Sequence, residues 1–206
     1  MISRRYSILT TLMCVCLIAS NIFETKVFHA GLITLTGGFI IFPLSYVIND
    51  CLTEVYGYKK ARFSIFLAFA MNALFVGFAQ IVRILPAEQF WDGQEHFDYI
   101  FAADLRITIA SMLAFVCGSL INSKVMAAMK LRQGEKGFGW RAVLSTLLGE
   151  TSDSLIFFPI AFWSLGMKNV IVMMVTQILL KTLYEIVILP VTAKFVKHLK
   201  KCEIDN

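Results

Sequence analysis

Charged residues are scarce in this chain of 206 residues: Asp, Glu, Lys and Arg make up 16% of the sequence. Soluble domains carry about 25%. Hydrophobic residues make up 58% instead, and the mean hydropathy is +0.72. The hydrophobic residues gather in runs close to the ~20 residues that a bilayer-spanning helix needs. These runs occupy most of the chain and leave no room for a soluble domain of typical size.

Signals for metal binding and for hydrolytic catalysis are also missing. The three histidines lie in predicted loops or in the tail, which argues against a histidine metal site and a Ser–His protease. The five cysteines show no zinc or disulfide spacing. Asp153 has no second buried aspartate in a matching motif, as an intramembrane aspartyl protease would need, and no channel filter motif is visible. The glycine-rich segment 134–139 lacks the Lys-Ser/Thr end of a phosphate loop. The sequence therefore predicts no enzyme, no cofactor and no metal.

Six apolar runs predict an all-α bundle of transmembrane helices, forming a single domain over residues 1–206. The predicted spans cover about residues 7–23, 30–49, 63–85, 105–122, 141–165 and 170–196.

The distribution of charge predicts the orientation of this bundle. Lys and Arg gather at the N-terminus, in loops 50–62 and 123–140, and in the C-terminal tail, whereas loop 86–104 carries acidic residues only. Positively charged loops stay in the cytoplasm. Both chain ends are therefore expected inside the cell. We assign the net charge of +5 to this topology and not to nucleic-acid binding.

Ionisable residues inside a bilayer are costly, so they usually mark a function or a buried pair. Glu150 and Asp153 lie three residues apart in the fifth span, on one helix face. Gln177, Lys181 and Glu185 follow one another at four-residue spacing in the sixth. Both groups are expected near the bilayer midplane. One interpretation is a buried ion pair between Lys181 and a carboxylate, and another is a binding site that contains this pair.

Other polar residues have two interpretations each. Asp50 and Glu54 form an i,i+4 pair at the inner end of the second span, either as a solvated helix end or, with Glu185, as candidates for gating or ion coupling. Arg106 lies about one turn inside the outer surface, where it could bind substrate or snorkel outward. Asn21 is a candidate ligand or an interhelical hydrogen-bonding group. A polar midplane site without an ATPase motif favours a secondary transporter of a small solute.

Short segments along the predicted helices occur in a fixed order over nearly the whole chain. They are 19–21 (Ala-Ser-Asn), 49–57 (Asn-Asp-Cys-Leu-Thr-Glu-Val-Tyr-Gly), 106–111 (Arg followed by Ala-Ser), 145–154 (Ser-Thr-Leu-Leu-Gly-Glu-Thr-Ser-Asp-Ser), 157–158 (Phe-Phe), 161–163 (Ala-Phe-Trp), Lys181 and Pro190. In this order the chain resembles the queuosine precursor transporter family, also called the vitamin-uptake-like transporter family.

The resemblance implies a transporter in the bacterial cytoplasmic (inner) membrane that imports a 7-deazaguanine for tRNA modification. The substrate would be the cyano or aminomethyl precursor of queuosine, or the free base queuine. Asp153 or Glu150 could accept the two N–H groups of its guanine-like edge. The carbonyl could be bound by one of four side chains: Asn21, Gln177, Arg106 or Lys181. Phe157 or Trp163 could stack on the ring, although packing against lipid explains these aromatics equally well.

Two other functions stay open at this point. The chain could be the substrate-binding subunit of an energy-coupling-factor vitamin importer, which would need ATPase partners. It could also be a membrane protein without transport activity. The sequence does not show whether an ion is coupled to transport, or whether the chain forms a homo-oligomer in the bilayer.

Overall fold

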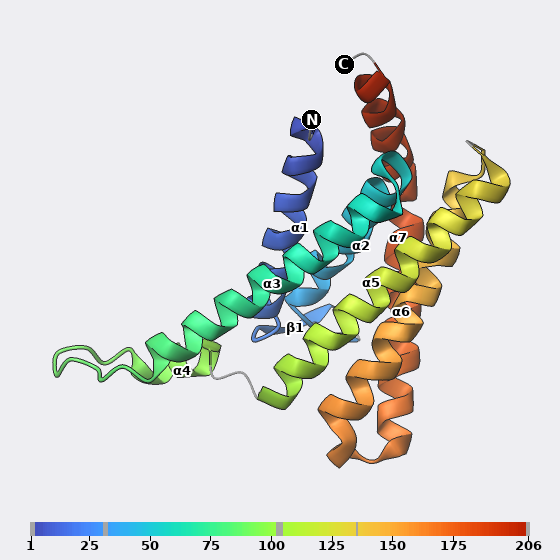
Figure 1. Ribbon diagram of the computed structural model, residues 1–206. Helices are drawn as coiled ribbons and strands as arrows, with labels where there is room; N and C mark the ends of the chain where they lie inside the picture. The colour runs from blue at the N-terminus through green and yellow to red at the C-terminus, as the bar shows by residue number, and fades with distance from the viewer. Residues whose placement is uncertain (1–2, 31–32, 102–104, 135, 205–206) are drawn as a thin grey trace.

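The computed structural model describes residues 3–30, 33–101, 105–134 and 136–204, and it is all-α apart from one short hairpin (Figure 1). In chain order the elements are α1 (Arg4–Phe23), β1 (Val27–Ala30), β2 (Ile33–Thr36), α2 (Gly38–Tyr56), α3 (Tyr58–Arg83), α4 (Gln94–Phe101), α5 (Leu105–Gln133), α6 (Phe138–Phe162), the 3-10 helix η1 (Trp163–Leu165) and α7 (Met167–Ile204). The predicted all-α class is confirmed.

Five of these helices are long and apolar enough to cross a membrane: α1, α2, α3, α5 from Ile107 onward, and α7. The fifth predicted span, about residues 141–165, corresponds to α6, which has 25 residues but does not belong to these five. Its apolar sequence is interrupted by the polar run 150–154. The fold is therefore that of a multi-pass membrane protein with five clear spans and one long polar-centred helix beside them.

The outer surface of α7 is apolar along its length. Its exposed large side chains recur every four residues, which places them on one stripe of the helix. They are Ile171, Val175, Leu179, Leu183, Val187 and Val191. Glu185, on another face of the same helix, is buried. Apolar side chains outside and carboxylates inside are the arrangement expected for a helix that faces lipid.

One end of the bundle brings together both chain termini (Figure 1). Ser3 Oγ donates a hydrogen bond to Glu203 Oε1 at 2.5 Å, and Arg5 Nη1 donates to the Cys202 carbonyl at 2.8 Å. Tyr6 Oη donates to the Lys60 carbonyl at 3.1 Å, which adds the start of α3. The hydrophobic core lies at this end, where α1 packs on α2 and α3 through residues such as Met13.

The backbones of α5 and α6 approach closely at two glycines. A methyl group added at Gly118 would lie 2.5 Å from Tyr46 Oη and 2.9 Å from the Gly149 carbonyl oxygen. One at Gly149 would lie 2.9 Å from the Gly118 carbonyl oxygen and 3.1 Å from the Tyr46 ring. The absence of side chains at both positions therefore lets the helices touch and leaves room for Tyr46 of α2.

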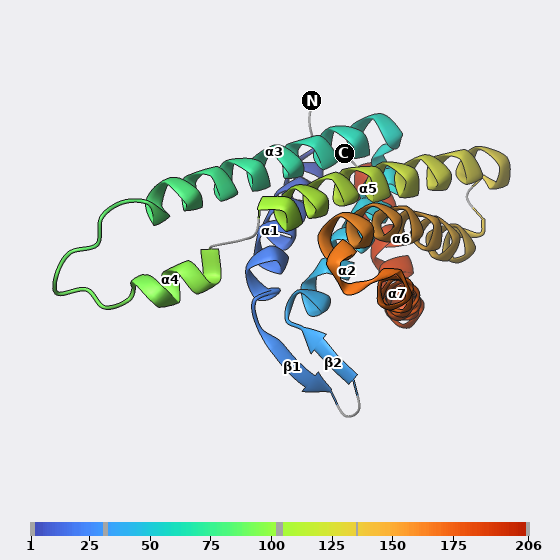
Figure 2. The ribbon, with the colours of Figure 1, turned by 90° about the horizontal axis from the view of Figure 1, so that it is seen from below.

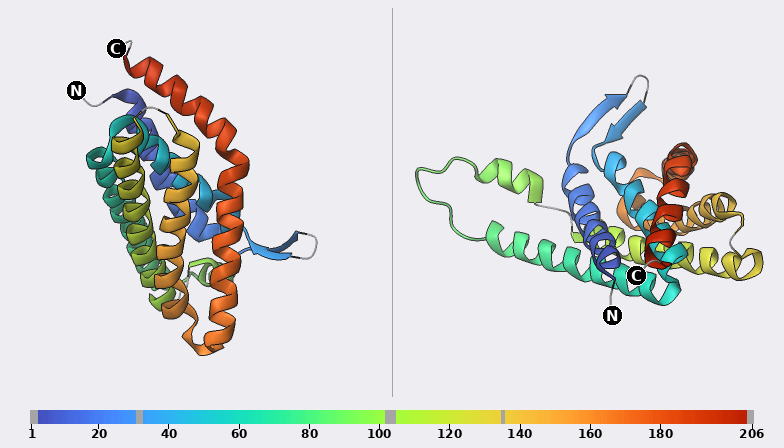
Figure 3. Two further views of the ribbon diagram at one scale, coloured as in Figure 1. Left: turned by 90° about the vertical axis from the view of Figure 1, so that its right-hand side faces the viewer. Right: turned by 90° about the horizontal axis from the view of Figure 1, so that it is seen from above.

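The predicted second span begins too early. Residues 27–30 and 33–36 form an antiparallel hairpin, with Val27 opposite Thr36 and Ala30 opposite Ile33, and α2 begins only at Gly38. Hydropathy alone cannot tell a short apolar strand from helix, but β-branched residues such as Ile33 and Thr34 favour a strand. The hairpin projects sideways from the bundle, partway along α7 (Figure 3).

Other predicted boundaries also differ. The predicted loop 86–104 contains α4, which packs against the end of α3 at the side of the bundle (Figure 2). Helix α5 continues to Gln133, well beyond the predicted end at residue 122, and α7 continues to Ile204. Both extensions contain several basic residues. A prediction from hydropathy therefore places the end of the span before the end of the helix.

Candidate functional site

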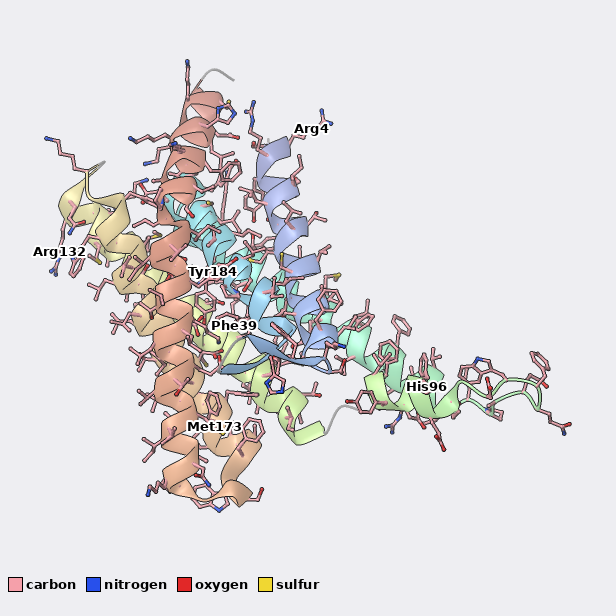
Figure 4. The ribbon with its side chains drawn as sticks, turned by 180° about the vertical axis from the view of Figure 1, so that it is seen from behind. Arg4, Phe39, His96, Arg132, Met173 and Tyr184 are labelled. Carbon is pink, nitrogen blue, oxygen red and sulfur yellow. The ribbon has the colours of Figure 1, made fainter. Side chains whose placement is uncertain are left out.

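A cavity of about 520 Å³ lies between the helices of the bundle, within the range of about 300–1,000 Å³ that is usual for small-molecule sites. Its walls come from α1, α2, α5, α6 and α7, with small contributions from α3, α4 and β2. Figure 4 labels two of the lining residues, Phe39 of α2 and Met173 of α7. The polar lining includes Asn21, Ser111, Asp153, Gln177 and Lys181, and the aromatic lining includes Phe39, Phe42, Phe157, Phe158 and Phe162.

Lys181 of α7 is the centre of charge at this cavity. Its Nζ lies 2.8 Å from Glu150 Oε2 and 3.6 Å from Asp153 Oδ2, both on α6. It also lies 4.2 Å from the centroid of the Phe42 ring, within cation–π distance. The predicted ion pair is thus present, with both carboxylates as partners. These three groups carry one net negative charge when all are ionised, and Glu24, which also lines the cavity, adds a second.

The structure brings most of the predicted ligands to this cavity. Asn21, Asp153, Gln177, Lys181 and Phe157 line it from three different helices, α1, α6 and α7. Asn21 Nδ2 also donates a hydrogen bond to Asn72 Oδ1 at 3.0 Å, so α3 holds the orientation of its amide. Both interpretations of Asn21 are therefore compatible with its position.

Three predicted ligands are placed differently. Glu150 is buried against Lys181 and does not line the cavity. Trp163 lies in η1 with 67% of its surface exposed, beside a smaller hollow and not at the cavity. Arg106 belongs to α5, but its side chain lies outside the described residues.

Glu54 lies at the end of α2 that is distant from the cavity, and it is fully buried. Its Oε1 lies 3.1 Å from Arg141 Nη2, 2.6 Å from Lys200 Nζ and 3.5 Å from Lys130 Nζ. One carboxylate thus joins α2 to α5, α6 and α7. Interpreting this segment as a solvated helix end is wrong, because Asp50 is buried as well.

Asp50 and Glu185 lie between the cavity and the Glu54 cluster. Both are essentially fully buried, on α2 and α7. Neither Asp50 oxygen has a hydrogen-bond partner in the described part of the chain, and Glu185 Oε1 has none either. The two carboxylates therefore lack the cations that accompany the other buried acids.

The chain also matches a known protein family. A family model described as "putative vitamin uptake transporter" matches residues 36–195, which is most of the chain and includes every charged group described above except Arg5, Glu203 and Lys200. The chain belongs to this family.

Two curated relatives of this family member carry more specific names. The chain is 33% identical over 133 residues to a "Probable queuosine precursor transporter" of Haemophilus influenzae, a match covering 62% of this chain and 52% of the relative. It is also 33% identical over 132 residues to a "Queuosine precursor transporter" of Escherichia coli strain K12, covering 62% and 55%. The chain spans about half the length of the curated relatives that it matches. No solved structure matches it significantly.

Sequence reasoning missed several residues that complete the site of this transporter-family member. Phe42 and Tyr46 precede Asp50 and Glu54 at four-residue spacing, so the whole row shares one face of α2. From this four-residue spacing, Phe42 and Tyr46 could have been predicted to share a helix face with the two acids. The partners from other helices, such as Arg141 against Glu54, could not be found by spacing, because they depend on how the helices pack.

Proposed function

We propose that the chain is a secondary transporter that imports a queuosine precursor, a 7-deazaguanine, across the bacterial cytoplasmic membrane for tRNA modification. Family membership and the names of the two relatives support this proposal. The structural observation that supports this proposal is the cavity, in which the buried carboxylate of Asp153 lies beside amide and aromatic side chains.

The chemistry of the cavity suits a guanine-like base. The Asp153 carboxylate accepts the two adjacent N–H groups of the base edge, and the amide of Gln177 or Asn21 donates to its carbonyl. Phe157 and Phe42 offer flat apolar surfaces, and base–aromatic stacking is worth about 1–3 kcal/mol in other sites. The Nζ of Lys181, 3.6 Å from Asp153 Oδ2, provides a positive charge beside this carboxylate.

Arg106 stays a candidate for the same carbonyl. It immediately precedes Ile107 and Thr108, which line the cavity. In the same proposal Glu150 acts through Lys181, and Trp163 packs against lipid at the outer surface.

The proposed topology has six spans in one domain, with α6 as the additional span and both chain ends in the cytoplasm. The 25 residues of α6 suffice to cross the bilayer, and α6 packs between α5 and α7. Its acids, Glu150 and Asp153, lie beside Lys181 of α7, and the hydroxyls of Thr151 and Ser152 donate to backbone carbonyls of α6 itself, so no charged group of this run needs to face lipid.

Rescue of queuosine in tRNA tests the proposal. The chain is expressed in a bacterium that lacks both precursor synthesis and its own importer, and each deazaguanine is supplied at low concentration. We expect rescue by the native chain. Asp153→Asn should raise the half-maximal precursor concentration about 10- to 100-fold, because a hydrogen bond to a charged group contributes about 1.5–3 kcal/mol. Asp92→Asn, an exposed position in the loop before α4, is the matched control.

Absence of rescue, with the native chain shown to be in the membrane, would refute the substrate class. Equal rescue by the Asp153→Asn and Asp92→Asn variants would refute the site. Uptake by the purified chain alone in liposomes separates this proposal from the vitamin-importer subunit, which would be inactive without its ATPase partners.

A further inference from the structure

Two rows of side chains face each other between α2 and α7. On α2 the row is Phe42, Tyr46, Asp50 and Glu54, and on α7 it is Gln177, Lys181 and Glu185. The helices are in contact, and ring contacts such as that of Phe39 with Tyr184 cross between them. The rows run from the cavity at Lys181 toward the Glu54 cluster at the end that holds both termini.

Some of the buried acids along these rows have a cation beside them, and others do not. Glu150 and Asp153 share Lys181, and Glu54 has three cations around it. Asp50 of α2 and Glu185 of α7 lie in the middle, close enough for their charges to interact, and neither has an ion pair among the described residues. The side chain of Asn122 on α5 is buried beside Asp50, close enough for its amide to interact with that carboxylate. Three buried polar side chains, none of them with a cation beside it, thus converge from three helices.

We propose that Asp50 and Glu185 form one proton-binding site, and that import of the substrate is coupled to entry of this proton. The coupling rests on the proposed function. Two carboxylates whose charges interact in a low-dielectric interior cannot both be ionised without a large cost, and one shared proton removes it. A proton needs no further ligand. A hard metal cation would need about six oxygen ligands, and the described residues contain no group of three or more His, Cys, Asp and Glu side chains able to hold a metal.

The position of Tyr46 connects this proton site to the cavity. Its hydroxyl is buried without a hydrogen-bond partner among the described residues, and it lies close enough to Asp50, Glu150 and Asp153 for their charges to act on it. Glu185 lies one helical turn from Lys181 and faces Glu150. Loading the proton therefore removes a negative charge next to the ion pair that borders the substrate.

Several ionisable groups surround the pair. They are Tyr46, Cys51 and Glu54 from α2, Glu150 from α6, and Tyr184 from α7. None of these is a cation, and Lys181, one turn from Glu185 on α7, is paired with Glu150 and Asp153. In each cycle one proton binds a carboxylate from the outer side, forming one O–H bond, and leaves to the cytoplasm when that bond breaks. The substrate moves in the same direction.

The test uses the full chain in liposomes with the radiolabelled aminomethyl precursor, in two assays. Counterflow against unlabelled precursor requires binding and movement but no gradient, whereas accumulation under an inward proton gradient requires coupling. We expect the native chain to do both. Asp50→Asn and Glu185→Gln should keep counterflow within about threefold and lose at least tenfold of the gradient-driven accumulation. The exposed Glu95→Gln change on α4 is the matched control.

The outcomes separate the two proposals. No counterflow by the native chain refutes the substrate, whereas counterflow without proton-driven accumulation refutes only the coupling. Accumulation driven by a sodium gradient at equal pH, or normal accumulation by both amide variants, also refutes the coupling.

A second measurement needs no substrate and tests the proton site even if the amide variants fail to fold. Infrared difference spectra of the purified native chain across a pH step should show a buried carboxylic acid band. The conservative variants Asp50→Glu and Glu185→Asp should shift this band, and Glu95→Gln should not. A spectrum without that band, or a band that neither conservative variant shifts, overturns the proton site.

Discussion

At the scale of single residues, the site is determined by which buried acid has a cation beside it. Lys181 is 2.8 Å from Glu150 and 3.6 Å from Asp153, and only 11% of its side chain is exposed. Burying three charges costs solvation free energy, which their mutual attraction largely offsets. Removing one partner leaves that cost uncompensated, so the cation should matter for stability as well as for substrate binding.

Replacing Lys181 by Met tests this balance. We expect the free energy of unfolding in detergent to fall by about 3–5 kcal/mol, because Glu150 and Asp153 become unpaired buried acids. Adding Glu150→Gln to Lys181→Met should recover part of the loss. Lys168→Met, at an exposed position at the start of α7, should change stability by less than about 0.5 kcal/mol. A Lys181→Met protein as stable as the Lys168→Met control would show that the pair contributes nothing.

At the scale of elements, the close contact of α5 with α6 sets the shape of the site. Gly118 and Gly149 let the two backbones approach, and Tyr46 of α2 fits against both. Small residues at helix contacts are common in membranes, where packing rather than hydrophobic burial drives association. Tyr46 and Asp153 both lie against Gly118 at this contact, and Asp50 follows Tyr46 by one turn of α2, so helix packing controls the distance between the two sites.

Replacing Gly118 by Ala should disturb this contact. The added methyl group would meet the backbone oxygen of Gly149, which cannot rotate away, so we expect a loss of about 1–3 kcal/mol of stability in thermal unfolding. Gly77→Ala in α3 is the matched control, since nothing lies within 4 Å of its added methyl group. It should gain up to about 1 kcal/mol from helix propensity. Equal effects of the two changes would mean that α5 and α6 are not tightly packed at Gly118.

At the scale of the whole molecule, one end of the bundle collects both termini and most of the basic residues. The starts of α1 and α3 and the end of α7 meet there through Ser3, Tyr6 and Glu203. Lys130, Arg141 and Lys200 surround Glu54 at the same end. Loops rich in Lys and Arg stay on the cytoplasmic side. The acidic loop before α4 should then face outward.

Reporter fusions test this orientation. We expect green fluorescent protein fused to the C-terminus to fluoresce, because it folds only in the cytoplasm. Alkaline phosphatase inserted at Asp92 should be active, because it needs the oxidising exterior. Phosphatase activity at the C-terminus would contradict the proposed six-span topology and would fit an odd number of spans.

The sequence by itself determined the class of the protein, the apolar runs and the position of each buried acid along its helix. These are local properties, because side chains three or four residues apart share a helix face wherever the helix lies. The ion pair of Lys181 with Glu150 or Asp153 could be predicted, because the two helices carry opposite charges at similar depth.

Only the tertiary structure decided which acids are paired. Glu54 has three cations around it and Asp50 has none among the described residues, although the two acids lie one turn apart on the same face of α2. Ala30 and residues 33–36 likewise became strand residues, although their hydropathy suits a helix. The reason is the same in both cases. Pairing across elements depends on how neighbouring helices are rotated and shifted against each other, and no spacing along one segment contains that information.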